Sequence, residues 1–223
     1  MKLSNDTLSV LKNFASINPG LEFKEGNTIQ TISPGKTILA KAVLKDSFPE
    51  DFCVYDLNQF LSVHSLVKDA NIEFDGANII LKSGKSKIKY RKASRETIVL
   101  PPDKTLSLPS VDVSFKLEES VLASIMKSAS VLQSPNIAVE SSDDHIHVTC
   151  FDAKDDSAHT NSIEVADNAG GKFKMVFLTE NLKMIPGSYD VEISSKGLAS
   201  FKNTIQEIDY WIAIESKESK FGE

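Results

Sequence analysis

An internal repeat constrains the fold of this chain more than any other feature. Residues 2–17 read KLSNDTLSVLKNFASI, and residues 116–131, which begin 114 positions later, read KLEESVLASIMKSASV. A second match follows in the same order, because residues 54–61 (VYDLNQFL) align with residues 176–183 (VFLTENLK) at an offset of 122. Two matches in the same order at nearly the same offset indicate a duplicated unit of about 110 residues, with a loop insertion between the matches.

Each half begins with an amphipathic helix and continues with short strands. The apolar residues Leu8, Leu11 and Phe14 recur with the helical period, and Pro19-Gly20 ends that helix. In the first half we expect a second helix from Asp56 to about Val67 and strands at 21–24, 28–32, 37–44, 51–55, 72–75, 78–82, 86–91 and 97–100. In the second half we expect helices at 118–131 and 180–185, and strands at 136–141, 145–151, 158–165, 173–178, 189–194, 198–202 and 208–215.

The pattern predicts an α+β fold built from two tandem copies of one domain. The segment 101–111 contains Pro101, Pro102 and Pro109 and reads as an extended connector, because proline disfavours helix at and before its own position. We therefore place the first domain at residues 1–100, the connector at 101–111 and the second domain at 112–223.

Composition excludes several classes of protein. Of 223 residues, 41% are hydrophobic and 25% are charged, as in an ordinary globular protein. No apolar run approaches the ~20 residues that a membrane helix needs, and the polar start of the chain shows no signal peptide. Cys53 and Cys150 lie in apolar runs, which suits reduced cysteines in a cytoplasm. The net charge of −6 argues against nucleic-acid binding by the surface as a whole.

No motif in the sequence carries a recognisable chemistry. Pro34-Gly35-Lys36-Thr37 resembles the end of a phosphate-binding loop, but the glycine that the motif needs five residues before Gly35 is Gln30. His145 and His147 would share one face of a strand, whereas alternation puts Cys150 on the opposite face and no third ligand follows at a fixed spacing. We expect neither a catalytic site nor a cofactor, and exposed strand residues are the simpler interpretation of the histidine pair.

The exposed faces of the expected helices carry small polar residues and lysine. Acidic residues lie only at the helix starts, where capping and the helix dipole favour them. Such a face suits the backbone of a polyanion without reading bases, although chance sorting of charge would give the same pattern. The residues on these faces are Asn5, Ser9, Lys12, Asn13, Ser16, Asn58, Gln59, Ser62, His64, Ser65, Lys68, Ser120, Ser124, Lys127, Ser128, Asn181 and Lys183.

Charge also differs between the two halves. Residues 82–95 hold seven basic residues and no acidic residue, whereas residues 140–167 hold eight acidic residues against Lys154. Alternation in the strand 86–91 places its cations on one face, opposite Ile88 and Tyr90. The basic strand could bind nucleic acid, or it could meet the acidic region of a neighbouring copy head to tail, which closes a ring if the rotation allows. Solvated faces explain both stretches equally well.

Together these features resemble a DNA polymerase sliding clamp, in particular the clamps of T-even-like tailed bacteriophages. The segments that carry the resemblance are MKLSNDTLSVLKNFASINPG (1–20), VYDLNQFLSVHSLV (54–67), KDDSAHT (154–160), LKMIPGSYDV (182–191) and IAIES (212–216). The resemblance runs from end to end, but the basic stretch 82–95 is not typical of the family.

The resemblance implies a closed homotrimeric ring with antiparallel sheets outside and helices lining a hole that encircles duplex DNA. It implies a non-enzymatic processivity factor that tethers the DNA polymerase, is opened by an ATP-dependent clamp loader and acts without a membrane in the host cytoplasm. By the same resemblance, the residues that would face DNA are Lys12, Lys127, Lys68, Lys183 and Lys2. The apolar pocket for partner peptides would include Leu106 and Leu108 on the connector, with Ile212 and Ile214 on the last strand.

Two other functions remain open at the level of sequence. The first is an assembly protein without DNA, which would polymerise through its basic and acidic halves. The second is an enzyme that uses the His145–His147 strand face and a metal ion.

Overall fold

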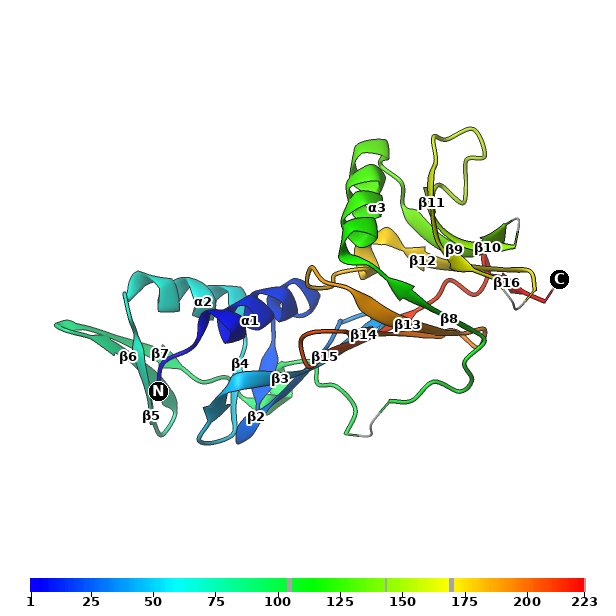
Figure 1. Cartoon of the computed structure of the whole chain (residues 1–223). Coiled ribbons are helices and arrows are strands. Elements are labelled where there is room, and N and C mark those ends of the chain that lie inside the picture. Colours follow the sequence, from blue (N-terminus) through cyan, green and yellow to red (C-terminus); the bar gives the residue numbers. More distant parts are fainter. Residues whose placement is uncertain (104–105, 143, 169–170, 223) are drawn as a thin grey trace. The chain divides into compact units, whose positions relative to one another are not determined.

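The chain folds into two compact units. The computed structural model describes residues 1–103, 106–142, 144–168 and 171–222. Unit 1 spans Met1–Asp103 and unit 2 spans Lys104–Glu223 (Figure 1).

Unit 1 consists of two helices and two antiparallel sheets. Its strands form the orders β4-β1-β2-β3 and β5-β6-β7. The helices are α1 (Asn5–Ile17) and α2 (Leu57–Leu66), with a short 3₁₀ turn, η1, at Arg95–Thr97. The strands are β1 (Leu21–Phe23), β2 (Gly26–Ile32), β3 (Ile38–Phe48), β4 (Phe52–Val54), β5 (Asn71–Asp75), β6 (Asn78–Ser83) and β7 (Ser86–Arg91).

Unit 2 contains one α-helix, α3 (Glu119–Leu132), and again two antiparallel sheets. The strand orders are β11-β10-β9-β12-β16 and β8-β13-β14-β15. A 3₁₀ turn, η2, lies at Thr179–Asn181. The strands are β8 (Val113–Leu117), β9 (Asn136–Ser142), β10 (His145–Phe151), β11 (Asn161–Asp167), β12 (Phe173–Leu178), β13 (Tyr189–Ser194), β14 (Leu198–Asn203), β15 (Ile208–Ala213) and β16 (Lys220–Phe221).

The strand orders confirm the duplication predicted from the repeat. The order β4-β1-β2-β3 of unit 1 reappears as β12-β9-β10-β11 in unit 2, and β5-β6-β7 reappears as β13-β14-β15. Even β8 has a counterpart, because Met1 and Ile72 exchange two backbone hydrogen bonds of 2.7 Å, as paired strand residues do. The α+β fold with two copies of one domain is therefore confirmed.

The first helix of each unit packs on its sheet through the apolar face that the sequence predicts. In unit 1, Leu11 and Phe14 of α1 are fully buried, and α2 lies beside α1 on the same side of the strands (Figure 1). The Phe23 ring stacks on Phe52 with centroids 4.5 Å apart. Burial of each such side chain stabilises the fold by roughly 1.5–3 kcal/mol. In unit 2, Ile125 of α3 has the same role.

The strand expected at 97–100 is wrong, because this segment forms the η1 turn and an extended segment outside any strand. Instead of a neighbouring strand, the Asn18 side chain binds the backbone of this segment. It donates to the Val99 carbonyl oxygen over 3.1 Å and accepts from the Gly20 N–H. Gly20 lies directly against this segment, since a Cβ atom there would be 2.7 Å from Ile98 Cγ2.

Two expectations in unit 2 are also wrong. The expected helix at 180–185 is only the single turn η2, and the segment after it leads through Pro186 to β13. The stretch 113–117, which was not expected to form a strand, is β8 and pairs with β13 over its whole length.

In unit 1, the segment 34–37 that resembles the end of a phosphate-binding loop forms a turn between β2 and β3. In this turn the Ser33 hydroxyl oxygen accepts from the Thr37 and Ile38 N–H groups.

Candidate nucleic-acid interface

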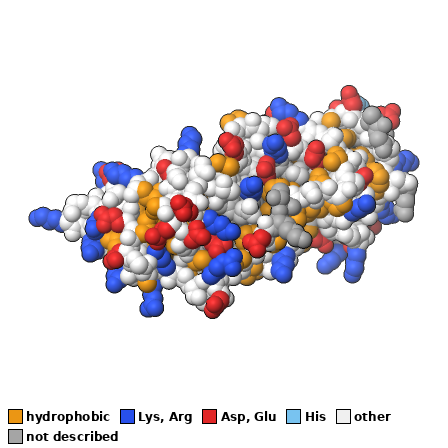
Figure 2. Space-filling model, turned by 90° about the horizontal axis from the view of Figure 1, so that it is seen from below, with side chains coloured by type: hydrophobic (Ala, Val, Ile, Leu, Met, Phe, Trp, Pro, Cys, Tyr) orange, Lys and Arg blue, Asp and Glu red, His pale blue; other side chains and the backbone are white. Residues whose placement is uncertain are grey.

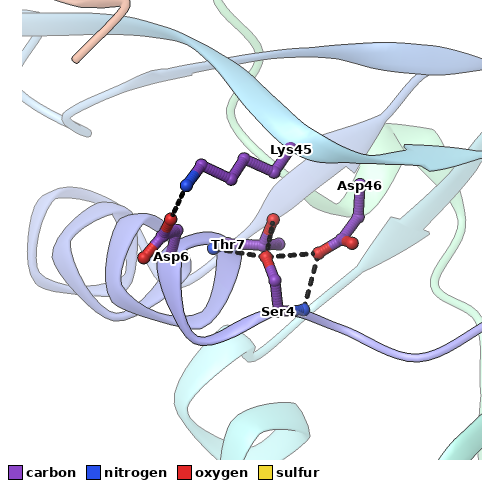
Figure 3. Close-up of polar contacts among 5 residues, drawn as sticks. All are labelled: Ser4, Asp6, Thr7, Lys45 and Asp46. Carbon is purple, nitrogen blue, oxygen red and sulfur yellow. Dashed lines mark hydrogen bonds and ion pairs between the residues drawn. The ribbon is translucent and has the colours of Figure 1, made fainter.

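The start of α1 is fixed by a small polar cluster (Figure 3). Ser4 caps the helix, since its hydroxyl oxygen accepts from the Thr7 N–H over 3.2 Å. The Ser4 N–H and hydroxyl both donate to one oxygen of Asp46 on β3, over 2.7 and 2.8 Å. Asp6, the one acidic residue in the first turn of α1, forms an ion pair with Lys45. These contacts tie the start of α1 to β3.

The environment of Asp46 keeps its carboxylate charged. Burial opposes ionisation, but hydrogen bonds from the Ser4 backbone and from the Thr7 and Ser4 side chains outweigh it and hold the pKa of Asp46 below its usual value. A charged Asp46 therefore anchors the cap of α1 to the sheet at neutral pH.

The resemblance to sliding clamps implies five DNA-facing lysines. Four of them are exposed and have no acidic partner among the described residues. Lys12 lies on α1, Lys127 lies on α3, Lys68 follows the C-cap of α2, and Lys2 precedes α1. Acidic side chains do not share these stretches of α1 and α3 beyond the first turn of each helix. The exposed surfaces of the helices can therefore attract a polyanion without competition from their own residues.

The fifth lysine, Lys183, is also exposed, but it lies beyond η2 rather than on a helix. Asn181, which was expected on the exposed face of the same helix, is buried. The expected fourth helix face is therefore absent from the described part of unit 2, and three α-helices carry the small polar and lysine residues. His64 on α2 adds no charge at neutral pH, because burial lowers its pKa.

The start of α3 is capped differently from the sequence expectation. Glu118 occupies the N-cap position, but its side chain makes no capping hydrogen bond. Ser188, which precedes β13, supplies the cap instead by accepting from the Glu119 N–H over 3.0 Å. The Glu118 carboxylate accepts from Lys116 and from the Ser188 hydroxyl, and these contacts lower its pKa.

The basic stretch 82–95 divides into two groups. Three of its cations bind acids of unit 1, in the pairs Lys82–Glu73, Lys92–Glu50 and Arg95–Glu22. The other four, Lys85, Lys87, Lys89 and Arg91, form no ion pair in the part of the chain that the structure describes, and all four are exposed. Basic side chains gather at the left end of Figure 2, where Figure 1 places the β6–β7 hairpin.

The strand β7 has the two faces that alternation predicts. Lys87, Lys89 and Arg91 point to solvent, whereas Ile88 and Tyr90 are half-buried. The Tyr90 ring meets Phe60 of α2 edge-on at 5.4 Å, and its hydroxyl donates to the Asp56 carbonyl oxygen. Because β7 is the last strand in the order β5-β6-β7, its outer backbone groups are not used within that sheet.

The acidic stretch 140–167 ends on β11, which is the last strand in the order β12-β9-β10-β11 of unit 2. β11 carries Glu164 and Asp167, both exposed, and β10 carries His145 beside them. The His145 Nδ1 atom lies 3.5 Å from a Glu164 oxygen and 3.2 Å from an Asp167 oxygen. Two acids earlier in the stretch 140–167 have other partners: Glu140 pairs with Lys174, and Asp155 accepts from the Ser157 N–H. Asp143 lies outside the described residues.

The two histidines on β10 share a face, as expected. Their rings lie 6.5 Å apart and perpendicular, while Cys150 is fully buried on the other side of the strand. Within the described residues, no group of three or more His, Cys, Asp or Glu side chains is placed to hold a metal ion.

The residues expected at a partner-peptide pocket have different degrees of burial. Leu106 and Leu108 are half-buried, whereas Ile212 and Ile214 of unit 2 are buried. A buried isoleucine can support a docking surface from beneath but cannot form its outer wall. No pattern in the sequence predicts an apolar groove of about 260 Å³ that lies beside α3. The groove is lined by Glu119, Leu122, Ala123, Met126, Leu182, Met184 and Pro186.

The described helices include none that is long and apolar enough to cross a membrane. The molecule that these observations define has a duplicated α+β domain, acid-poor helix faces and two oppositely charged edge strands.

This fold is that of sliding clamps. The chain resembles the PCNA2–PCNA3 complex from Sulfolobus tokodaii with a TM-score of 0.68, at 13% identity, covering 97% of this chain and 100% of that one. It resembles PCNA from Thermococcus kodakaraensis with a TM-score of 0.68 at 14% identity, covering 93% and 95% of the two chains. For the H. pylori beta clamp the TM-score is 0.70 at 11% identity, covering 96% of this chain and 65% of that one.

Sequence similarity then defines the family. Residues 4–100 match the family model described as DNA polymerase processivity factor, and residues 114–216 match the model described as gp45 sliding clamp, C terminal. The sliding clamp of Escherichia phage RB69 is 33% identical, with 97% of both chains covered, and that of Enterobacteria phage T4 is 32% identical with the same coverage. The chain belongs to the sliding-clamp family of DNA polymerase processivity factors, and the resemblance to the clamps of T4-like phages is confirmed.

Proposed function

We propose that three copies of this chain close into a ring around duplex DNA and tether the DNA polymerase, without catalysing a reaction themselves. The observation that carries this proposal is the surface of α1, α2 and α3. Lys12 on α1 and Lys127 on α3 lie there among serine and asparagine residues, the acids of these two helices are confined to the first turn, and Lys68 follows α2. Such a surface binds the phosphate backbone of DNA of any sequence.

Weak contacts suit this function better than strong ones. Each exposed lysine attracts phosphates over a distance that physiological salt limits to about 8 Å, and no base is read. A ring held this way stays on DNA through its closed shape and slides because no single contact is tight. Tethering raises the effective concentration of the polymerase at the primer end without a further binding surface.

The edge strands support a head-to-tail contact between copies. β7 presents Lys87, Lys89 and Arg91 on its exposed face, and β11 presents Glu164 and Asp167. Antiparallel pairing of these two strands would place opposite charges on one face of a continuous sheet, an arrangement that stabilises cross-strand pairs. We infer that β7 of one copy pairs with β11 of the next, which uses the backbone groups of both edges.

The other partners follow from the same function. An ATP-dependent clamp loader opens the ring, the protein needs no cofactor of its own, and it works in the cytoplasm of the infected cell. Lys2 and Lys183 extend the DNA-facing surface beyond the helices.

The experiment that tests the proposal reverses the charge of Lys12 and Lys127 together. We expect Lys12→Glu/Lys127→Glu to assemble normally, as judged by native mass in light scattering, and to lose most of its stimulation of DNA synthesis in a loading assay. The matched control is Lys24→Glu/Lys202→Glu, which changes the net charge equally at exposed positions outside the helices. Full stimulation by the helix variant would contradict the DNA-facing assignment, and a wild-type chain that stays monomeric in the loaded state would contradict the ring.

Partner peptides have a separate candidate site. We propose that Leu106 and Leu108 contact them, with Ile212 and Ile214 supporting the surface from beneath. Replacing both leucines with alanine should weaken polymerase binding at least tenfold in a pull-down titration, because each removes about 2 kcal/mol of apolar contact, while the native mass stays unchanged. Unaltered binding would contradict this site.

A further inference from the structure

The edge strand β11 contains a bulge that places its acids around one histidine. The register between β10 and β11 shifts between Ile146 and His147, so that Ile146 pairs with Ala166 and His147 with Glu164. One residue of β11, Val165, is therefore extra. Bulges bend a strand and redirect its side chains. Here both Glu164 and Asp167 come close to the His145 Nδ1 atom, at 3.5 and 3.2 Å.

Among the described residues, no other acidic side chain lies within 4.0 Å of this imidazole. On β10 the neighbour is His147, whose ring is perpendicular at 6.5 Å. On β9 the residue opposite His145 is Ser142, and Glu140 further along that strand is paired with Lys174 of β12. Asp144, in the turn before β10, is exposed and forms no ion pair there.

The surroundings of Nδ1 explain why its charge matters. The atom is buried, lies beside the two carboxylates and makes no hydrogen bond to any residue that the structure describes. The carboxylates themselves are open to solvent, with side-chain exposures of 58% for Glu164 and 94% for Asp167. Each carboxylate can therefore turn inward to a protonated imidazole or outward to a cation on another chain.

We propose that His145 is a positioning residue of the contact between copies, and that it makes assembly of the ring sensitive to acid. This inference rests on the proposed pairing of β7 with β11. When His145 is neutral, Glu164 and Asp167 are free to meet Lys87, Lys89 and Arg91 of the next copy. When it is protonated, the imidazolium holds the two carboxylates and adds a positive charge beside an incoming basic strand.

Proton linkage fixes the direction of the effect. A basic strand docked beside His145 disfavours the proton, so association releases it, and association must therefore tighten as pH rises. Histidine is the side chain that ordinarily changes charge between pH 5 and 8.

The test measures assembly of the full chain by sedimentation velocity at pH 7.5, 6.5 and 5.5 and constant ionic strength. The salt concentration is chosen so that the wild type is half dissociated at a convenient concentration at pH 7.5. The variant is His145→Gln, and the matched control is His159→Gln, which makes the same change at an exposed position of unit 2. Far-UV circular dichroism checks that each chain is folded at each pH.

We expect the dissociation constant of the wild type and of His159→Gln to rise about tenfold from pH 7.5 to 5.5. That of His145→Gln should change less than threefold, since glutamine carries no charge at any of these pH values. An equal rise in all three proteins, or none in the wild type, would overturn the role of His145 and leave the ring intact. A wild type that never assembles would overturn the proposed ring, and with it this inference.

Discussion

The two units share one topology but fill the position of the second helix in different ways. In unit 1, sixteen residues (55–70) separate β4 from β5, and ten of them form α2. In unit 2, ten residues (179–188) separate β12 from β13, and only η2 forms. Ten residues that must also contain Pro186 cannot form a three-turn helix and return to the sheet. Duplication thus preserved the strand order, while the length of one connection decided whether a helix forms.

Each unit stabilises this position by a different kind of contact. α2 buries Leu57, Phe60 and Leu61 against unit 1. In unit 2 two buried tyrosines bind the backbone of Ile185, since Tyr189 donates to its carbonyl oxygen and Tyr210 accepts from its N–H over 3.2 Å. Burial raises the pKa of Tyr189 to about 12, so both hydroxyls stay protonated at physiological pH. At this position unit 1 is held by apolar packing of α2, whereas unit 2 is held by hydrogen bonds between two tyrosines and the Ile185 backbone.

The largest expected effect is on the packing of α2. Phe60 and Leu182 occupy equivalent positions at the offset of 122, and both are buried. Phe60→Ala should lower the free energy of unfolding by about 3–5 kcal/mol and Leu182→Ala by about 2–3 kcal/mol. Urea unfolding at a fixed chain concentration, followed by far-UV circular dichroism, measures both. A loss for Leu182→Ala as large as that for Phe60→Ala would mean that unit 2 also depends chiefly on apolar packing at this position.

Removing the caps of α1 and α3 is expected to lower the free energy of unfolding by smaller amounts, which differ between the two units. Ser4 caps α1 locally and also binds Asp46, whereas α3 receives its cap from Ser188, which is distant in sequence. Ser4→Ala should cost about 1–2 kcal/mol, and Ser188→Ala about 0.5–1 kcal/mol. The same urea unfolding experiment compares them, with Ser16→Ala at an exposed position of α1 as the control. If Ser188→Ala proves as harmless as the control, the distant cap contributes nothing.

The smallest effect concerns the tyrosine anchor. Tyr210→Phe removes the oxygen that accepts the Ile185 N–H and keeps the ring, so we expect a loss of about 1 kcal/mol. Trp211, the single tryptophan of the chain, lies next to Tyr210 on β15, and its fluorescence reports unfolding of unit 2. A stability equal to that of the wild type would show that packing alone holds the segment 182–186.

Much of the candidate site could be predicted from the sequence, because periodicity is a local property. The period near 3.6 placed Lys12 and Lys127 on exposed helix faces, and alternation placed Lys87 and Lys89 opposite Ile88 and Tyr90. The partners of these residues could not be predicted in the same way. Of the seven cations in 82–95, the structure pairs Lys82, Lys92 and Arg95 with acids that lie 9, 42 and 73 positions away in sequence.

The sequence by itself determined the duplication, the first helix of each copy, most strands and the opposite charges of the stretches 82–95 and 140–167. Only the tertiary structure decided that 97–100 lies against Gly20 outside any sheet, that unit 2 lacks a second helix, and that a bulge brings Glu164 and Asp167 to His145. The physical reason is that helix and strand patterns follow from each residue's near neighbours along the chain. Registers, bulges and ion pairs depend instead on which distant backbone groups find partners when the sheets close.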